Sequence, residues 1–196
     1  GSYNVALGRS ALQANTTASN NTAVGYSASG LNTTGTSIVA VGANALYQNT
    51  VGSNNTAIGL SSLTSNVWGG SNTAVGTSAL QSNTTASNNT AVGYLALLSN
   101  TTGADNTSVG TQSLQLNTVG QSNSAFGRYA LQNNTASYNT AIGHASLQEN
   151  TTASNNTAVG YQAGYANTTG KINSAVGHSA LGSNTTGNYN TAFGAY

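Results

Sequence analysis

Residues 72–88 read NTAVGTSALQSNTTASN, and residues 89–105 read NTAVGYLALLSNTTGAD. The two stretches are copies of one 17-residue unit that continues along the whole chain. The glycine that ends the NTAVG motif marks each copy, at Gly8, Gly25, Gly42, Gly59, Gly76, Gly93, Gly110, Gly127, Gly143, Gly160, Gly177 and Gly194. The spacing is 17 residues throughout, except for 16 residues between Gly127 and Gly143. A fixed period of this kind indicates a repeat architecture.

Each unit contains two short apolar segments, TAV and SAL, on either side of the glycine, followed by an Asn-Thr-rich stretch. Apolar residues do not recur at helical spacing, whereas glycine and Asn-Thr clusters mark turns. We therefore expect two short strands per unit, a glycine bend and an Asn-rich turn. Such a unit cannot bury its own apolar side, so the units should stack as coils. The expected fold is an all-β parallel β-solenoid, or β-roll, with one repeat domain over residues 1–196.

Some positions of the unit hardly vary. The residue two before the glycine is alanine in every copy except Ser108, and the residue three after it is always alanine or serine. These small residues indicate very close approach, either inside a narrow coil or against another chain. Seven residues after the glycine stands an asparagine, and stacked side-chain amides can form a ladder. The predicted ladder is Asn15, Asn32, Asn49, Asn66, Asn83, Asn100, Asn117, Asn134, Asn150, Asn167 and Asn184.

Charge is the scarcest property of this chain. Charged residues make up 3% of it, against about 25% in typical soluble proteins, and the formal net charge is +1. Without clusters of Lys and Arg, we expect no nucleic acid as a partner. No apolar run approaches the roughly 18 residues of a membrane helix, so we expect no membrane insertion. The chain has no cysteine, which excludes thiolate metal ligands.

Candidates for catalysis and metal binding are few. The two acids, Asp105 and Glu149, fall nearly three coils apart, too far for a carboxylate pair. His144 and His178 share one position of the unit but lie two coils, or about 10 Å, apart, too far to share a metal ion. We expect them to be two exposed residues. The sequence therefore predicts no enzyme, no metal site and no cofactor.

The position directly after the glycine varies freely among Arg, Tyr, Leu, His and small residues, as expected of a solvent-facing row. Tyr26, Tyr94 and Tyr161 lie in it, and exposed tyrosines can stack on and hydrogen-bond sugars. Trp68 replaces a turn threonine and marks a distinct loop. These four residues are either a glycan-binding surface or scattered surface aromatics on a shaft.

The motifs NTAVG, NTAIG and NSAVG resemble the repeats of YadA-like heads in trimeric autotransporter adhesins, and the longer unit resembles repeats of bacteriophage tail fibres. The similarity covers the whole chain, although this unit is longer than that of typical YadA heads. The resemblance implies parallel β-rolls in a homotrimer, displayed extracellularly on a cell or virion surface. It implies a structural and adhesive role, with a cell-surface glycan or a protein as receptor.

The apolar content of one coil is small, which independently favours burial between chains as well as within them. An alternative function is ice binding, because a threonine recurs three residues before the glycine and a hydroxyl row at ~4.8 Å spacing can order water. This row comprises Thr22, Thr56, Thr73, Thr90, Thr107, Thr140 and Thr157, and it is interrupted by Val5, Val39, Ser124 and Ser174. We expect the threonines to share a side with the apolar residue two positions on, and therefore to point inward.

Overall fold

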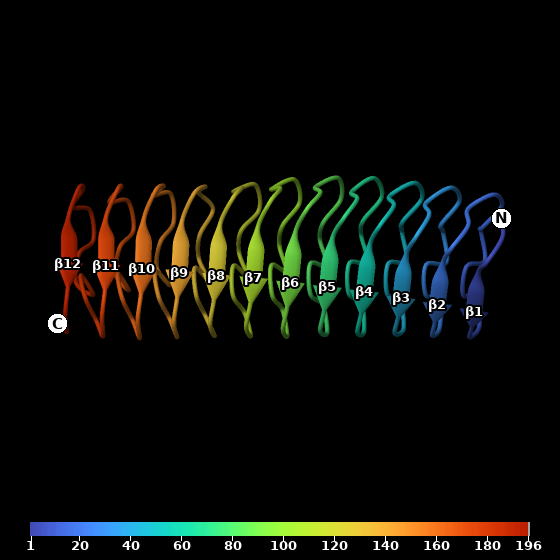
Figure 1. Ribbon diagram of the computed structural model, residues 1–196, viewed down its shortest axis with the longest axis horizontal. Coiled ribbons are helices and arrows are strands. Elements are labelled where there is room, and N and C mark those ends of the chain that lie inside the picture. The colour runs from blue at the N-terminus through green and yellow to red at the C-terminus, as the bar shows by residue number, and fades with distance from the viewer. Residues whose placement is uncertain (196) are drawn as a thin grey trace.

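The computed structural model describes residues 1–195, which form a single stack of coils with one three-residue strand in each (Figure 1). The strands are β1 (Val5–Leu7), β2 (Thr22–Val24), β3 (Val39–Val41), β4 (Thr56–Ile58), β5 (Thr73–Val75), β6 (Thr90–Val92), β7 (Thr107–Val109), β8 (Ser124–Phe126), β9 (Thr140–Ile142), β10 (Thr157–Val159), β11 (Ser174–Val176) and β12 (Thr191–Phe193). Within this described range the structure contains no helix. The predicted β-solenoid with about 17-residue coils is confirmed.

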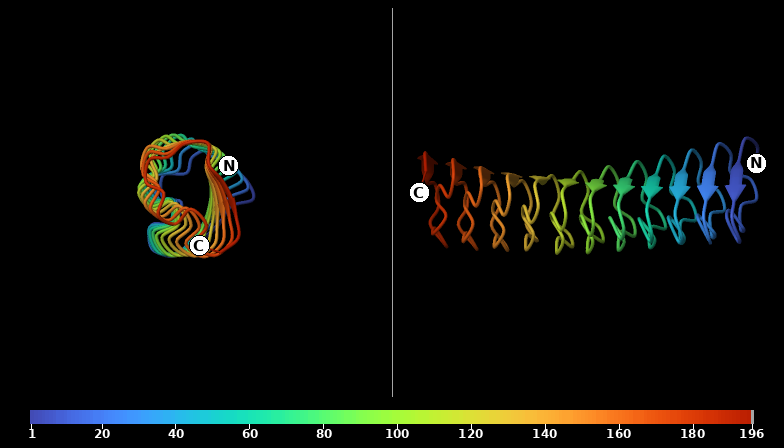
Figure 2. Two further views of the ribbon diagram at one scale, coloured as in Figure 1. Left: turned by 90° about the vertical axis from the view of Figure 1, so that its left-hand side faces the viewer. Right: turned by 90° about the horizontal axis from the view of Figure 1, so that it is seen from below.

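All twelve strands form one parallel sheet in chain order. Each residue pairs with its equivalent one coil away, as Ala74 does with Ala91 in β5 and β6. The pairing stays in register across the 16-residue coil, where Ala125 of β8 pairs with Ala141 of β9. Viewed from the end, the coils superimpose as closed loops with a gradual twist (Figure 2). The missing residue is therefore absorbed in a turn and not in the sheet.

The second segment of each unit is not a strand, which corrects the expectation of two strands per coil. In the segment after Gly76, Ser78 and Leu80 have φ of 54° and 53°, in the left-handed region. Inter-coil hydrogen bonding nevertheless continues, since the Ser78 amide donates to Leu60 O at 2.9 Å and the Leu80 amide to Ala96 O at 3.0 Å. Because every second residue is left-handed, the chain changes direction within a few residues. The segment is therefore a series of tight turns whose backbone groups hydrogen-bond to the neighbouring coils.

The glycine that ends each strand is required by both conformation and space. Gly76 has φ of 133°, a backbone conformation that side chains with a Cβ rarely adopt. A Cβ on Gly76 would lie 2.5 Å from the carbonyl oxygen of Gly93 in the next coil. The recurrence of glycine at this position therefore follows from close stacking of the backbone.

The interior is lined by small residues and, in all but two of the complete coils, one leucine; Ser29 and Gly164 stand at that position in the other two. In the coil of Gly76, the side chains of Ala74, Ala79 and Leu80 are all fully buried. Of the two arrangements left open by the sequence, the small residues thus line the coil interior. Where serine replaces both alanines of one coil, Ser108 and Ser113, the two hydroxyls hydrogen-bond each other.

Candidate functional site

The Asn ladder lies in the interior, and its amide groups hold neighbouring coils together. Asn66 Nδ2 donates to Asn49 Oδ1 at 2.9 Å and to its own turn at Gly69 O, also at 2.9 Å. The same two bonds recur at Asn83, whose Nδ2 donates to Asn66 Oδ1 at 2.8 Å. Since these side chains are fully buried, each hydrogen bond also satisfies a polar group that water cannot reach.

The ladder is interrupted once, at the 16-residue coil. The turn there is one residue shorter, and Asn134 Nδ2 donates to Ala136 O, two residues on, at 2.8 Å. Asn117 Oδ1 is left buried without a hydrogen-bond partner. The ladder resumes in the next coil, where Asn150 Nδ2 donates to Asn134 Oδ1 at 2.7 Å. The break coincides with the one irregular spacing of the repeat.

A second buried Asn column, four residues before each glycine, was missed by the sequence reasoning. Asn72 Nδ2 donates to Ala86 O at 2.9 Å, the carbonyl that also accepts from Asn83 Nδ2. Asn72 Oδ1 accepts from the backbone amide of Asn89 in the next coil at 3.0 Å. The signal was present in the sequence, because this position opens the NTAVG motif and departs from asparagine once, at Ile38. Both Asn columns are structural and face away from solvent.

The outer face of the sheet presents two continuous rows. In β2 to β11 the central residue, which is alanine or Ser108, is buried, and the residues on both sides of it, such as Thr73 and Val75, are at least partly exposed. The expectation that threonine points inward is therefore wrong: threonine and the apolar residue share a side, but that side is the outer one. We call the apolar row, which directly precedes each glycine, the outer stripe. It comprises Leu7, Val24, Val41, Ile58, Val75, Val92, Val109, Phe126, Ile142, Val159, Val176 and Phe193.

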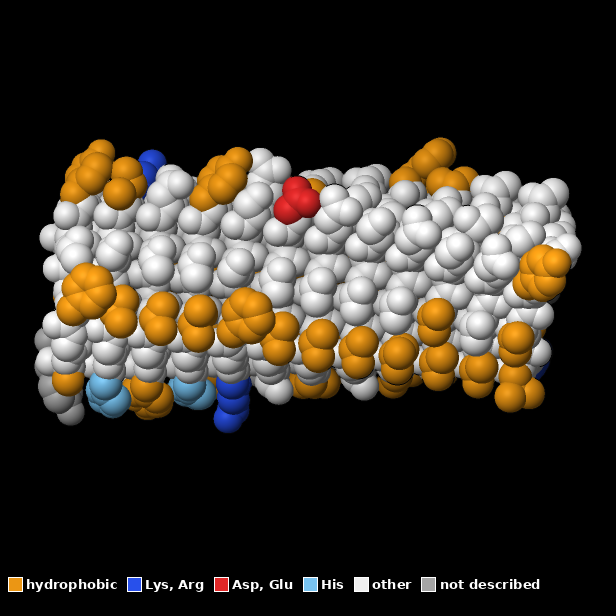
Figure 3. All heavy atoms as spheres, viewed as in Figure 1, with side chains coloured by type: hydrophobic (Ala, Val, Ile, Leu, Met, Phe, Trp, Pro, Cys, Tyr) orange, Lys and Arg blue, Asp and Glu red, His pale blue; other side chains and the backbone are white. Residues whose placement is uncertain are grey.

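The outer stripe runs the length of the stack as a nearly unbroken apolar band (Figure 3). Its larger members are the most exposed, with Phe126 41% and Ile142 43% exposed. Neither the stripe nor the threonine row contains a charged residue. An exposed apolar surface of this extent is typical of an interaction surface.

The four aromatic residues considered for glycan binding do not form one site. Tyr26, Tyr94 and Tyr161 are exposed in the row after the glycine, but four coils separate each from the next. Trp68 is 65% exposed and lies in a different column, nine residues after Gly59. The Arg9 guanidinium carbon lies 6.0 Å from the ring centroid of Tyr26. Among the described residues, Tyr26, Tyr94, Tyr161 and Trp68 thus occupy separate positions and do not converge on one cleft.

Tyr161 belongs to a ring stack that the sequence did not reveal. Its ring is stacked between His144, with centroids 5.4 Å apart, and His178, with centroids 5.0 Å apart. Tyr129 meets His144 edge to face at 5.8 Å, and the Arg128 guanidinium carbon lies 4.4 Å from the Tyr129 centroid. We call these five residues the aromatic–cationic row. The histidines are exposed, as expected from the variability of their position.

The acids do not form a catalytic pair. Asp105 accepts a hydrogen bond from Asn88 Nδ2 at 3.1 Å, and Glu149 accepts one from Asn133 Nδ2 at 2.9 Å. In each case the donor lies in the preceding coil, so each acid takes part in a separate coil-to-coil contact. Within residues 1–195, no three His, Asp or Glu side chains are grouped so that they could hold a metal ion.

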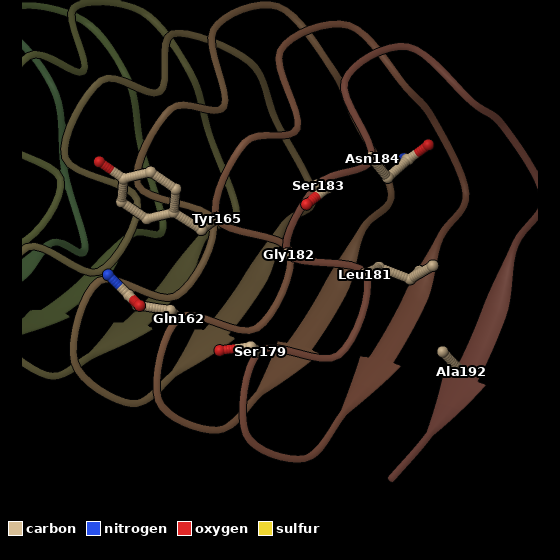
Figure 4. A pocket seen from close by; sticks show the side chains of 8 residues that line it. All are labelled: Gln162, Tyr165, Ser179, Leu181, Gly182, Ser183, Asn184 and Ala192. Atoms are coloured by element: carbon tan, nitrogen blue, oxygen red, sulfur yellow. The ribbon is translucent and has the colours of Figure 1, made fainter. Parts of the chain in front are cut away.

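A hollow lies at the C-terminal end of the described stack (Figure 4). Its volume is ≈ 560 Å³, and it is lined by Gln162, Tyr165, Ser179, Leu181, Gly182, Ser183, Asn184 and Ala192. Leu181, Asn184 and Ala192 occupy the positions that face the interior in other coils. The hollow is thus the uncovered end of the coil interior, and its lining carries no charged group.

A scan against protein-family models and searches of curated proteins and of solved structures find no match to this chain. The fold and the repeat define its class as a parallel β-solenoid repeat protein. Among the described residues, no helix is long and apolar enough to cross a membrane.

Proposed function

We propose that this chain is a structural and adhesive segment of an extracellular fibre, on a cell or virion surface, in which three copies pack in parallel through their outer stripes. The observation that carries the proposal is the stripe itself, an uncharged apolar row repeated in every strand. The number three comes from the resemblance to trimeric adhesin heads. The chain has no catalytic role in this proposal.

The thin interior supports burial between copies. A typical coil encloses two small residues and one leucine, so each coil has little apolar area to bury within the chain. Packing outer stripes together would add an apolar residue per coil to the buried surface. Because the strands of parallel copies share one repeat, every coil would make the same contact.

Oligomeric mass tests the packing. We expect light scattering to give the mass of a trimer for the purified chain. Val92→Asp introduces a charge into the stripe and would bury three carboxylates together, so it should shift the mass towards monomer. Thr77→Asp is the matched control, since Thr77 is exposed in the adjacent variable row. A folded wild-type monomer would refute the assembly.

The attachment role has its own test. The exposed side chains of Tyr26, Tyr94, Tyr161 and Trp68 remain candidates for contact with a cell-surface glycan or a protein receptor. A glycan array probed with the purified chain should show binding that weakens when Trp68 or Tyr94 is changed to alanine. Absence of binding would remove the glycan and leave the protein receptor to be tested with cells.

Ice binding is the second candidate, and the outward direction of the threonine row favours it. Thr73, Thr90 and their equivalents lie beside the apolar row on a regular sheet with strands ~4.8 Å apart. Both candidates use the same face, so a trimer packed through it would cover the hydroxyls. Thermal hysteresis shown by a monomer would favour ice binding, whereas a trimer without hysteresis would favour the fibre.

A further inference from the structure

The turn at residues 67–70 departs from the repeat and exposes an apolar surface. It reads VWGG, where the equivalent turn of the next coil, residues 84–87, reads TTAS. Trp68 is 65% exposed, and Val67 and Val51 of the preceding coil are half-exposed. The Val51 amide donates to Val67 O at 3.3 Å, so the two turns lie side by side. We call Val51, Val67 and Trp68 the tryptophan patch.

The indole of Trp68 is open on the side of Gly70. Burial alternates along this turn, with Trp68 exposed, Gly69 buried and Gly70 half-exposed, so residues 68 and 70 face the same outer side. The position of Gly70 holds a side chain in every other copy of the unit. A Cβ added to Gly70 would have only the backbone of Ser53 within 4 Å, with the carbonyl oxygen at 3.1 Å. The missing side chain therefore leaves free surface beside the indole.

The ring of Trp68 is available for stacking, in contrast to the ring of Tyr161. Tyr161 is stacked between His144 and His178. Within residues 1–195, no aromatic ring or cationic group contacts the indole of Trp68. An exposed aromatic face of this kind can pack against the apolar C–H face of a sugar ring.

The surroundings of the tryptophan patch are uncharged. Between Arg9 and Asp105 the chain contains no Lys, Arg, His, Asp or Glu. Asp105 belongs to a turn two coils further on, which is about 10 Å along the stack at the strand spacing of a β-sheet. An anionic ligand would find no cation at the patch, and neither would the phosphates of a nucleic acid. The ligand that fits is therefore neutral.

Hydroxyl groups lie around the ring. The Trp68 amide donates to Thr84 O at 3.1 Å, which places Thr85 in the coil beside the indole and in the same column. Ser71 follows in the turn of Trp68, and its amide donates to Ser53 O of the preceding coil at 3.0 Å. The side chains of Thr85 and Ser71 are exposed, and each hydroxyl can both donate and accept a hydrogen bond.

This combination selects the class of ligand. One open aromatic ring, with hydroxyls around it and no charge, suits a neutral hexopyranose, because that sugar has an apolar C–H face and a rim of hydroxyls. A protein interface buries about 800 Å² on each partner around an apolar core. Three apolar residues within a hydroxyl-rich surface do not supply such a core.

We propose that the tryptophan patch binds a neutral glycan by stacking a hexopyranose ring on Trp68, while Thr85 and Ser71 bond to the hydroxyls of the sugar. The site names a ligand class for the attachment role and rests on that proposed function, although it does not require the trimer.

The experiment uses the fluorescence of Trp68, which is the sole tryptophan of the chain and therefore reports on this site alone. The purified chain is titrated with cellohexaose, maltohexaose and galactohexaose, and with hexagalacturonate as a charged comparison. We expect at least one neutral sugar to shift the emission to shorter wavelengths, with a dissociation constant on the order of 1 mM. Hexagalacturonate should bind about threefold more weakly, because its carboxylates lose hydration and meet no cation. No shift with any neutral sugar, or equal binding of hexagalacturonate, would overturn the proposal.

Three variants test the parts of the site. Trp68→Thr gives this column the residue that it holds at Thr85, so the fold should be kept while binding weakens about tenfold. Gly70→Ser returns a side chain to the space beside the indole and should weaken binding about threefold. The matched control is Val119→Thr, which removes a 59% exposed apolar side chain from the same column outside the patch and should leave binding unchanged. Unchanged binding by Trp68→Thr, or an equal loss in Val119→Thr, would refute the site.

Two readouts separate failure of this site from failure of the attachment role. Fluorescence reports binding at Trp68, whereas ligand-observed NMR reports binding anywhere on the chain, including in Trp68→Thr. A neutral sugar that binds by NMR without changing the emission would overturn the site and leave glycan attachment standing. If neither signal changes, the site is overturned, and binding of the chain to cells decides whether attachment occurs through another receptor. Circular dichroism of each variant shows whether the fold is retained.

Discussion

The regular coils at residues 72–105 and the short coil before Gly143 are built from the same unit but satisfy their buried polar groups differently. In the regular coils, every ladder amide accepts from the next coil and donates to the previous one, as Asn83 does. In the short coil, the loss of one turn residue leaves Asn117 Oδ1 without a partner. The sheet is unaffected. The strand register is thus set by the sheet, while the ladder depends on the exact length of the turn.

The largest effect is expected where the backbones of regular coils approach most closely. Gly76→Ala should lower the free energy of unfolding by about 4 kcal/mol, because the added Cβ would lie 2.5 Å from Gly93 O at an unfavourable φ. Gly194→Ala is the control, since it has similar φ but no atom within 4 Å of the added Cβ. Its cost should be about 1–2 kcal/mol, from the backbone conformation alone. Equal costs in chemical denaturation would contradict the role assigned to close stacking.

Removing one ladder amide should come next. Asn83→Ala removes bonds to Asn66 Oδ1 and Ala86 O and the bond accepted from Asn100, so we expect a loss of about 3 kcal/mol. Asn117→Ala removes two equivalent donated bonds but no accepted one, and should cost about 1 kcal/mol less. Urea denaturation of both variants measures the difference. If Asn117→Ala costs as much or more, the ladder break has no energetic consequence.

The comparison also shows what repetition in the sequence can predict. Variation among the repeats predicts three features: the stacking register, the position of the Asn ladder and the exposure of the variable row. It does so because each residue contacts its equivalents in the neighbouring coils. The backbone of the SAL segment does not follow in this way. A leucine at φ near 53°, as at Leu80, is unfavourable in isolation, so local preference indicated a strand there. The coil closure overrides that preference.

Direction and ring contacts were also beyond the sequence. The sequence placed threonine and the apolar residue two positions on at the same side of the strand. The narrow interior accepts alanine and not valine, so threonine and valine both point outward. Likewise, the sequence placed His144, Tyr161 and His178 in one row, while the stacking of their rings depends on side-chain angles. The sequence therefore assigned the candidate surface residues to columns, but it did not show which way their side chains point or which rings stack.

A smaller effect is expected where glycine replaces the leucine of the core. Gly164 has φ of 61°, close to that of Leu80, and borders a cavity of ≈ 10 Å³ together with Leu147 and Leu181. Gly164→Leu should therefore lower the free energy of unfolding by about 1 kcal/mol, because the added Cβ would lie 2.9 Å from Leu147 Cδ2 at a positive φ and the cavity is too small for a whole leucine. Leu80→Gly is the reverse control and should also be destabilising, since it empties a filled interior position. A higher melting temperature for Gly164→Leu would show that the coil has not adapted to glycine.

The smallest effect should come from repairing the short coil. Insertion of one threonine after Thr135 restores the NTTAS turn of the regular unit and should return Asn134 Nδ2 to Asn117 Oδ1. One recovered bond to a buried acceptor is worth about 1 kcal/mol, reduced by the entropy of ordering the added residue. Thermal unfolding should therefore show a modest gain in stability, whereas insertion of threonine after Thr84, in a regular turn, should be destabilising. If both insertions destabilise equally, turn length is not what breaks the ladder, and the unpaired oxygen of Asn117 has another cause.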